Sequence, residues 1–281
     1  MAESSGTMWQ PSAFLKASAA FHAASAAAAL AFPDEWRLVA SGIVANHAAL
    51  TVAGLLPRCG WLGPNITRLP AAQARSGLVA LTFDDGPDPD VTPTILDLLG
   101  GAQARATFFC VGRRAEAHPE LVAAIRARGH GVENHTDSHP NGFALRGPRG
   151  LQWEIQRGQI AIERSGGGRP QFFRAPAGIQ NPWLSVVLAR AGLSLVSWTR
   201  RGFDTVTKDA GRVAARLHRG LRSGDILLLH DAGSALTAHG RPVVLEALPQ
   251  VLDEMARKGL RSEALHHILR RVRERGRDQI G

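Results

Sequence analysis

The sequence predicts an α/β protein in which strands and helices alternate to form a parallel sheet or barrel, preceded by a pair of hydrophobic helices. Three observations predict this class. Short apolar runs alternate with amphipathic segments from residue 78 to residue 258, chemically active polar residues follow several of those runs, and two long apolar runs occupy the first 56 residues. A repeated strand-then-helix order favours a parallel sheet, because each crossover helix returns the chain to the same end of the sheet.

Strands are predicted where short apolar runs are bounded by turn residues, at 78–83, 106–111, 131–134, 172–174, 193–198 and 226–230. Helices are predicted between and after them, at 92–100, 115–128, 150–165, 183–191, 210–221 and 242–258. Thr92 is the predicted N-cap of the first of these helices, with Pro93 at its first position. We place a domain boundary near Ser76, which separates an N-terminal segment, 1–75, from a catalytic domain, 76–281.

Composition excludes several classes of protein. Of 281 residues only two are cysteines, Cys59 and Cys110, and no CxxC occurs, which argues against a disulfide scaffold and a thiolate metal site. The net charge of +9 is compatible with an anionic partner, such as lipid headgroups or an acidic glycan. Because no motif interleaves aromatic and basic residues, we expect no nucleic-acid partner. The arginine-rich segment 270–277 is expected to be a solvated helix end.

The first apolar run covers residues 14–32 and the second covers 38–56, with a polar turn at 33–37 between them. Each run is close to the length that crosses a bilayer, so we expect a membrane-anchoring helical hairpin. Lipid would tolerate His22, Asn46 and His47 only if these residues faced each other between the helices. Two alternatives stay open, a soluble cytoplasmic protein whose helical pair packs on the barrel, and a less favoured signal peptide. The sequence does not determine which side of a membrane the catalytic domain faces.

Two adjacent aspartates mark the first candidate site. Asp84 and Asp85 follow the apolar run 78–83 and precede the turn Gly86-Pro87, which places both carboxylates at the carboxyl end of a buried strand. In parallel α/β folds that end lines the ligand crevice. Adjacent strand residues point to opposite sides, so one carboxylate could bind a metal while its neighbour reaches another side of the site. Because two neighbouring carboxylates repel, the pair favours a bound cation.

A pair of histidines offers further ligands. His135 and His139 are four residues apart, about one turn of a helix, so both imidazoles could face one point, as paired histidine ligands do on zinc-binding helices. With one aspartate they would form a two-histidine, one-carboxylate site that leaves positions open for water and substrate. Such a spacing also occurs by chance in a chain with 11 histidines, so the upstream aspartates carry much of this interpretation.

Five motifs in order resemble one known family. They are Thr82-Phe83-Asp84-Asp85-Gly86-Pro87, the segment from His135 to His139, Arg174-Ala175-Pro176, Trp198 with Asp204, and Leu227-Leu228-Leu229-His230. Together they resemble the polysaccharide deacetylase family, also called the NodB homology domain or carbohydrate esterase family 4. The resemblance covers roughly residues 76–260. It implies a distorted (β/α) barrel with seven units, and the residue pattern is compatible with that count.

The resemblance also implies roles for individual residues. Asp85, His135 and His139 would bind a divalent metal, with zinc as the expected ion. Asp84 would be the general base that activates the attacking water, and His230 the acid that protonates the departing amine.

The remaining implied roles belong to supporting residues. Arg174 would hold and tune Asp84, and Asp204 would orient Arg174. The backbone N–H of Ala177 is a candidate oxyanion donor. Asp137 is expected to face away from the metal or to support a ligand.

The implied reaction is metal-dependent hydrolysis that removes an N-acetyl or other N-acyl group from a glycan or a lipid-linked sugar. Alternatives are a deformylase or another non-peptide amidase on the same site, and a carbohydrate-binding relative without turnover. The chain departs from the family pattern at Ala177-Gly178, Arg201 and Thr205, where aromatic or acidic residues are usual. These departures and the pair Arg200-Arg201 favour a small or anionic sugar over a neutral chitin-like polymer.

Overall fold

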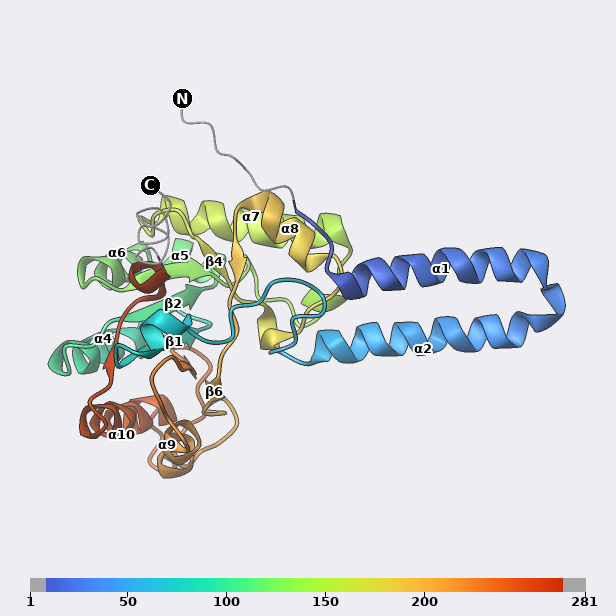
Figure 1. The fold of residues 1–281 in the computed structure, drawn as a ribbon. Coiled ribbons are helices and arrows are strands. Elements are labelled where there is room, and N and C mark those ends of the chain that lie inside the picture. The colour runs from blue at the N-terminus through green and yellow to red at the C-terminus, as the bar shows by residue number, and fades with distance from the viewer. Residues whose placement is uncertain (1–8, 270–281) are drawn as a thin grey trace, which may run out of the picture.

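The structure is a computed structural model that describes residues 9–269, so the arginine-rich segment 270–277 lies outside the described residues. Two helices, α1 (Ala13–Ala31) and α2 (Trp36–Leu55), are joined by the short 3-10 helix η1 (Pro33–Glu35). They form an antiparallel hairpin that projects away from the rest of the molecule (Figure 1).

Parallel strands and surrounding helices make up the remainder. The strands are β1 (Leu78–Asp84), β2 (Ala106–Cys110), β3 (Gly131–Asn134), β4 (Phe172–Phe173), β5 (Ser194–Leu195), β6 (Arg200–Arg201), β7 (Ile226–His230) and β8 (Arg261–Ser262). The helices are α3 (Ala71–Ala74), α4 (Thr92–Gly101), α5 (Gly112–Ala117), α6 (Pro119–Ala127), α7 (Pro148–Arg164), α8 (Leu184–Ala191), α9 (Ala210–His218) and α10 (Val243–Arg257), with 3-10 turns η2 (Phe143–Leu145) and η3 (Pro176–Gly178).

The sheet is parallel and curled. Its strand order is β5-β4-β3-β2-β1-β7-β6, and β8 pairs with the beginning of β1. The two ends of this order, β5 and β6, belong to one continuous segment, 194–201, so the same stretch of chain borders β4 and then β7. The prediction of a distorted α/β barrel with an N-terminal apolar helical pair is therefore confirmed.

The core lies between the sheet and its helices. Leu81, Phe83 and Phe108 are fully buried, and the rings of Phe83 and Phe108 stack with centroids 5.0 Å apart. A strand covered on both faces is expected to be apolar throughout, which explains why β1 reads as a continuous apolar run. Its neighbours in the sheet, β2 and β7, are also buried along their whole length.

Three local predictions need correction. The predicted helix 115–128 is two helices, α5 and α6, because Pro119 has no N–H to continue the first one. The predicted strand 193–198 is only the short β5, since Val196 bridges to Ile66 outside the main sheet order. Thr92 is not the N-cap of α4. Val91 holds that position, and the Thr92 hydroxyl donates instead to Asp231 Oδ2 at 2.8 Å.

The connector between hairpin and β1 packs as part of the barrel. Leu62 and Leu69 are buried, and Ile66 forms a parallel bridge with Val196. A division of the chain at residue 75 stays a prediction.

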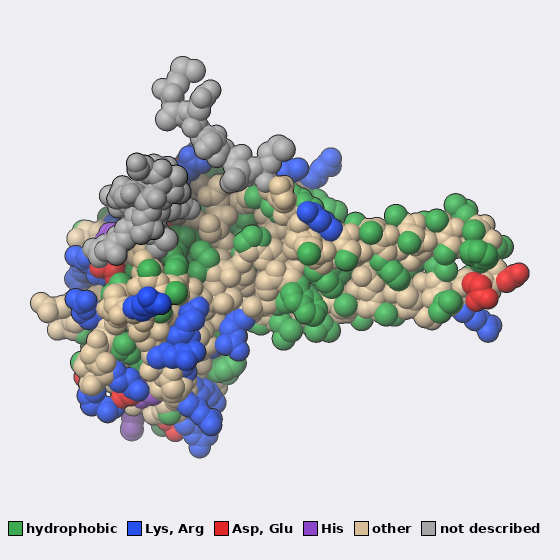
Figure 2. Space-filling view, in the orientation of Figure 1, with side chains coloured by type: hydrophobic (Ala, Val, Ile, Leu, Met, Phe, Trp, Pro, Cys, Tyr) green, Lys and Arg blue, Asp and Glu red, His purple; other side chains and the backbone are tan. Residues whose placement is uncertain are grey.

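The hairpin pairs several polar residues between its helices and exposes most of its large apolar side chains. Asn46 Nδ2 donates to Ser18 Oγ at 2.9 Å, and the rings of His22 and His47 meet edge to face with centroids 5.0 Å apart. Apolar side chains cover its outer surface, and charged side chains gather at its tip (Figure 2). By length and composition α1 and α2 could each cross a membrane, although a signal sequence meets the same criteria.

Candidate active site

The register of the parallel strands brings the predicted residues to one end of the barrel. Asp84 is the last residue of β1 and lies directly opposite His230, the last residue of β7. Asn134 at the end of β3 lies opposite Phe173 at the end of β4, so the residues that follow, His135 and Arg174, also leave the sheet side by side. Because the strands are parallel, all their carboxyl ends meet at the same edge.

Asp85, His135 and His139 form a compact cluster. Asp85 Oδ1 lies 3.2 Å from His135 Nε2 and 3.2 Å from His139 Nε2. One ligand atom from each residue lies within 4.8 Å of the others, which suits a single metal ion. Asp85 does not sit in the strand. Its φ of 77° turns the chain back, so its carboxylate reaches the same cluster that Asp84 borders, at 3.9 Å from His135.

The charges in this cluster are strongly coupled. Burial alone would raise the pKa of Asp85, but the close contact with His135 and the nearby imidazoles of His230 and His139 hold it well below its usual range. Burial would lower the pKa of His135, and Asp84 and Asp85 raise it above its ordinary value. At His139 burial and the neighbouring His135 lower the pKa. The lowered pKa of Asp85 means that its carboxylate is ionised between the two imidazoles.

The two histidines converge from a loop rather than from the turn of a helix that their spacing suggested. Residues 135–139 are irregular, with φ of 72° at Thr136 and 48° at His139. The Thr136 N–H donates to Asn134 Oδ1 at 2.8 Å, and the His139 N–H donates to Thr136 Oγ1 at 2.9 Å. These local hydrogen bonds replace the helical ones and turn both imidazoles toward Asp85.

Helix α7 holds this loop from the outside. Glu154 is buried and accepts hydrogen bonds from both the N–H and the hydroxyl of Ser138. Gly158 allows the close approach, because a Cβ there would lie 2.7 Å from the backbone of Thr136. The helix thus fixes the loop through one carboxylate and one glycine.

The tautomer of His135 is set by the backbone. Its Nδ1 lies 2.8 Å from the carbonyl oxygen of Arg174, which can only accept a hydrogen bond, so Nδ1 carries the proton. The lone pair of Nε2 then faces Asp85 and is available to a metal. A histidine ligand is commonly oriented this way, by a carbonyl on its second nitrogen.

Arg174 is fully buried and binds Asp84, as predicted. Its Nη1 donates to Asp84 Oδ1 at 2.6 Å and to Thr82 Oγ1 at 2.7 Å, and Nε and Nη2 donate to the carbonyls of Val196 and Ser197. The guanidinium also stacks over the Phe109 ring at 4.1 Å. With these partners Arg174 fixes one oxygen of Asp84 and leaves the other facing His135.

Asp204 does not orient Arg174, so that prediction is wrong. Its Oδ1 lies 2.8 Å from His230 Nδ1, and its Oδ2 accepts from the backbone N–H of His230 at 2.7 Å. The residue follows β6, next to β7, whereas Arg174 follows β4. Burial would lower the pKa of His230, but the hydrogen bond to Asp204 and the surrounding carboxylates raise it above its usual value.

Other polar residues take supporting positions. Asp137 is buried and faces Arg113 and Arg157, away from the cluster, as expected. Asp231 accepts from the Gly86 N–H at 3.1 Å and from Thr92, and burial raises its pKa to about 7. Asp231 and Glu154 were missed at the sequence level. The available signal for Glu154 was an acidic residue on the apolar side of the predicted amphipathic helix 150–165.

The two arginines after β5 do not form an anion site together. Arg200 is engaged by Asp225, with Nε to Oδ2 at 2.6 Å, so its expected role toward an anionic sugar is not supported. Arg201 packs over the rings of Trp198 and Phe203, with 5.5 and 5.0 Å to the centroids.

Comparison with known proteins identifies relatives of this arrangement. The family model for polysaccharide deacetylase matches residues 71–196. A peptidoglycan-N-acetylglucosamine deacetylase of Bacillus cereus is 33% identical over 195 residues, which are 69% of this chain and 88% of the relative. A chitooligosaccharide deacetylase of Bradyrhizobium sp. (strain ANU 289) is 34% identical over 188 residues, which are 64% of this chain and 85% of the relative.

A solved structure shares both sequence and fold. The family 4 carbohydrate esterase from Streptomyces lividans, in complex with acetate, is 36% identical with a TM-score of 0.60 and matches 66% of this chain and 91% of its own.

Proposed function

Because the chain belongs to the polysaccharide deacetylase family, we propose that it is a metal-dependent N-deacetylase of an N-acetylated glycan or lipid-linked sugar. The observation that carries this proposal is the cluster of Asp85, His135 and His139 beside Asp84, at the carboxyl end of the sheet. The named relatives act on peptidoglycan N-acetylglucosamine and on chitooligosaccharides, which favours acetyl over formyl as the acyl group removed.

The residues of the cluster fit a bound zinc ion. Two imidazole nitrogens and one carboxylate oxygen are a donor set that zinc accepts, and they leave positions for water and substrate. Asp85 Oδ1 is buried without a hydrogen-bond partner among residues 9–269, which is costly unless a cation satisfies it. When bound, such an ion would lower the pKa of a water molecule and polarise the acyl carbonyl.

We assign the general base to Asp84. Its Oδ2 borders the cluster at 3.9 Å from His135 Nε2, while its Oδ1 is fixed by Arg174. The buried guanidinium holds Asp84 in one orientation, so the free oxygen can take a proton from the attacking water.

We assign the general acid to His230, held by Asp204. The Asp204 carboxylate fixes the proton on Nδ1 and stabilises the charged imidazolium, which leaves Nε2 to donate a proton to the departing nitrogen. The raised pKa of His230 suits this task, because an acid must be protonated before the bond to nitrogen breaks. The Ala177 N–H makes no hydrogen bond to the residues that the structure describes, so it is available as an oxyanion donor.

One experiment tests the reaction. Zinc-loaded protein is incubated with N-acetylated chitooligosaccharides, peptidoglycan and polyprenyl-phosphate-linked N-acetylglucosamine, and released acetate and formate are measured. Acetate from at least one substrate is expected, with Asp84→Asn as the inactive control. Formate release from an N-formylated analogue without acetate from any acetylated substrate would support the deformylase alternative. Release of neither acid would support the non-catalytic alternative.

We also propose that the hairpin anchors the enzyme in a membrane. At about 1.5 Å per residue, the 19 and 20 residues of α1 and α2 span about 28 to 30 Å, the thickness of a bilayer's hydrocarbon core. Trp36 at the tip and Trp61 at the base are both exposed, at 60% and 59%, as expected for aromatic residues at the two interfaces. Asn46 pairs with Ser18 between the helices, and the ring of His22 meets that of His47. The exposed His47 also bonds the Ile43 carbonyl of its own helix, so these polar groups have the protein partners that lipid requires.

Liposome flotation tests the anchor. The full-length protein is expected to float with the lipid fraction at high salt, because apolar burial rather than charge holds it there. Val44→Asp, at the middle of α2, should reduce flotation, since an acidic residue at a helix centre costs about 2.5 to 3.5 kcal/mol on insertion. Protein that stays soluble without lipid or detergent would show that the hairpin is a soluble element.

A further inference from the structure

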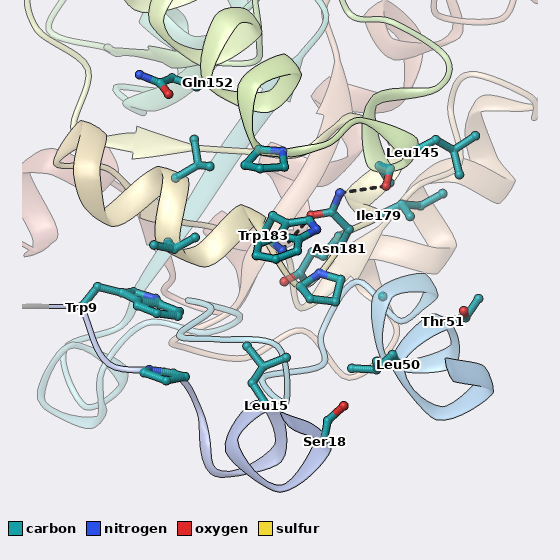
Figure 3. Close-up of a pocket in the computed structure, with 18 of the residues that line it drawn as sticks. Trp9, Leu15, Ser18, Leu50, Thr51, Leu145, Gln152, Ile179, Asn181 and Trp183 are labelled. Carbon is teal, nitrogen blue, oxygen red and sulfur yellow. Dashed lines mark hydrogen bonds between the residues drawn. The ribbon is translucent and has the colours of Figure 1, made fainter. Parts of the chain in front are cut away.

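The base of the hairpin and the side of the barrel enclose a large open groove of about 1310 Å³. One wall comes from α1 and α2, including Leu15, Ser18 and Leu50, and the other from α7, α8 and the loops that precede them (Figure 3). Pockets that hold drug-sized ligands measure about 300 to 1,000 Å³, so this groove has room for a larger occupant.

Two loops of the chain run from the active site to the groove. The loop that begins with His139 continues to Ala144 and Leu145 in the groove wall, and the loop that begins with Arg174 continues to Ile179 and Trp183. Asn181 ties the two loops together, because its Nδ2 donates to the carbonyls of Ala144 and Arg146 at 2.9 Å each. A ligand in the groove would therefore lie next to the segments that carry catalytic residues.

The lining is mainly apolar and includes large side chains that are wholly or partly exposed. Leu145 is 92% exposed and Trp183 is 54% exposed. Trp9, Leu15 and Leu50 line the opposite side, as Figure 3 shows. Contiguous exposed apolar surface of this kind marks a binding site. An apolar chain would remove these side chains from water.

Two cations stand in the lining. Arg149 and Arg190 are exposed, and neither forms an ion pair within the part of the chain that the structure describes. An unpaired guanidinium beside an apolar groove suits a phosphate group, which it can bind through paired N–H donors.

Close contacts attach the base of the hairpin to the barrel beside the groove. The Gln180 N–H donates to the Gly54 carbonyl at 2.9 Å, and a Cβ at Gly54 would lie only 2.4 Å from the Gln180 oxygen. Ser197 Oγ donates to the Pro57 carbonyl at 2.6 Å. These contacts fix the base of the hairpin to the loops after β4 and β5, so a hairpin embedded in lipid would place the groove at the membrane surface.

We propose that this groove binds the hydrocarbon chain of a lipid-linked N-acetylated sugar, with its phosphate near Arg149 or Arg190 and its sugar at the active site. The inference rests on the proposed function, because it names the substrate class of the same site. Three observations favour this occupant over a peptide: the apolar lining, the unpaired cations, and the position at the base of a hairpin of bilayer-spanning length.

Photo-crosslinking tests the groove without requiring turnover. The full-length protein in phosphatidylcholine nanodiscs is labelled with a diazirine-bearing polyprenyl phosphate, and labelled peptides are mapped by mass spectrometry. Labels are expected on peptides from α7, α8 and residues 141–152. Ala19→Trp and Gln152→Trp, which would fill the groove, should reduce this labelling at least about fivefold.

Matched controls use neighbouring positions that do not line the groove. Ala20→Trp on α1 and Gln159→Trp on α7 add the same ring and should leave labelling unchanged. Arg149→Ala with Arg190→Ala should weaken labelling by the phosphate probe but not by the corresponding polyprenol. Equal labelling of the filled and control variants, or equal labelling of the groove by a diazirine phosphatidylcholine, would overturn the proposal.

A second readout separates the groove from the reaction. Wild-type protein and both filled variants are assayed for acetate release from polyprenyl-phosphate-linked N-acetylglucosamine and from N,N′-diacetylchitobiose. Selective loss on the lipid-linked substrate in the filled variants supports the groove, and equal rates in all variants overturn it. Groove labelling with no acetate from either substrate would instead count against the proposed function and leave the binding site standing.

Discussion

The barrel and the hairpin place their apolar residues in opposite ways. In the barrel, Leu81 and Phe108 are fully buried, whereas in the hairpin Leu30 is 87% exposed and Leu38 is 71% exposed. The barrel completes the burial of its apolar residues with its own helices. In the hairpin such side chains have little protein cover, which is the pattern expected of a segment whose solvent is lipid.

Polar residues follow the same division. In the barrel, buried charges such as Arg174 and Asp84 gather at one edge of the sheet and pair for chemistry. In the hairpin, Ser18 and Asn46 pair between the helices, while Lys16 near the base and His47 stay exposed. We therefore propose that the two regions divide the work, with the barrel providing the reaction and the hairpin providing its location at a membrane.

The largest expected effect comes from His139, a proposed metal ligand. His139→Ala should lower metal affinity by more than about a hundredfold, which exceeds the loss typical for an outer partner of a ligand. Metal content by plasma emission spectroscopy and acetate release should fall together, while flotation with liposomes stays unchanged. His239→Ala, at an exposed histidine outside the site, is the control. Full activity in His139→Ala would contradict the assigned ligand set.

Truncating one leucine in the barrel and one in the hairpin tests the difference in burial between the two regions. Leu81→Ala should cost about 2 to 5 kcal/mol of unfolding free energy, because it opens a cavity in a filled core. Leu38→Ala should cost less than about 0.5 kcal/mol in non-ionic detergent, since the side chain packs on little protein. Urea unfolding of both variants measures the difference. A large loss for Leu38→Ala would show that the hairpin surface is a protein interface.

Acid should lower the unfolding free energy of the barrel through protonation of His130. Burial and the charges of Arg128 and Arg105 lower the pKa of His130 to about 4, and its Nδ1 accepts from the Ala106 N–H at 3.1 Å. The folded state thus disfavours the proton, so this contribution is complete above about pH 6.5 and is lost as pH falls toward 4. We expect a loss of about 2 kcal/mol at pH 5.

The control for the acid effect is His130→Asn, which keeps an acceptor for the Ala106 N–H but cannot gain a proton. Urea unfolding at pH 7 and pH 5 should show a smaller difference for this variant than for the wild type. An unchanged pH dependence would exclude His130 as its source.

A smaller effect concerns His230, the proposed general acid. Asp204→Asn should lower kcat/KM about tenfold, because the amide no longer stabilises the charged form of His230. Since Asp204 raises the pKa of His230, its loss should move the alkaline limb of the kcat/KM profile to lower pH. A lower rate with an unmoved alkaline limb would mean that Asp204 only maintains the fold.

Much of the site could be predicted because the relevant residues stand in order at strand ends. Asp84 followed from the rule that the carboxyl ends of parallel strands line the site, whereas Arg174 and His230 were identified through the resemblance to the family's motifs. Contacts between loops followed no such rule, so Asp204 was assigned the wrong partner. The spacing of His135 and His139 fits one turn of a helix. The loop that they adopt instead depends on local hydrogen bonds to the side chains of Asn134 and Thr136, which a spacing pattern does not reveal.

The features that the sequence did not reveal depend on long-range packing. Two-residue strands such as β6 and β8 are too short to give a periodic pattern. The groove needs the hairpin and the two catalytic loops to meet in space, which no local pattern specifies.

One assay tests most directly whether the barrel catalyses the reaction and the hairpin anchors it in a membrane. Wild-type, Asp84→Asn and Val44→Asp proteins are floated with liposomes, and each gradient fraction is measured for protein and for acetate release from N-acetylated chitooligosaccharides. We expect wild-type protein and activity to float together, Asp84→Asn to float without activity, and Val44→Asp to stay with the soluble fractions and keep its activity. Activity in Asp84→Asn, or wild-type protein that does not float, would contradict this account.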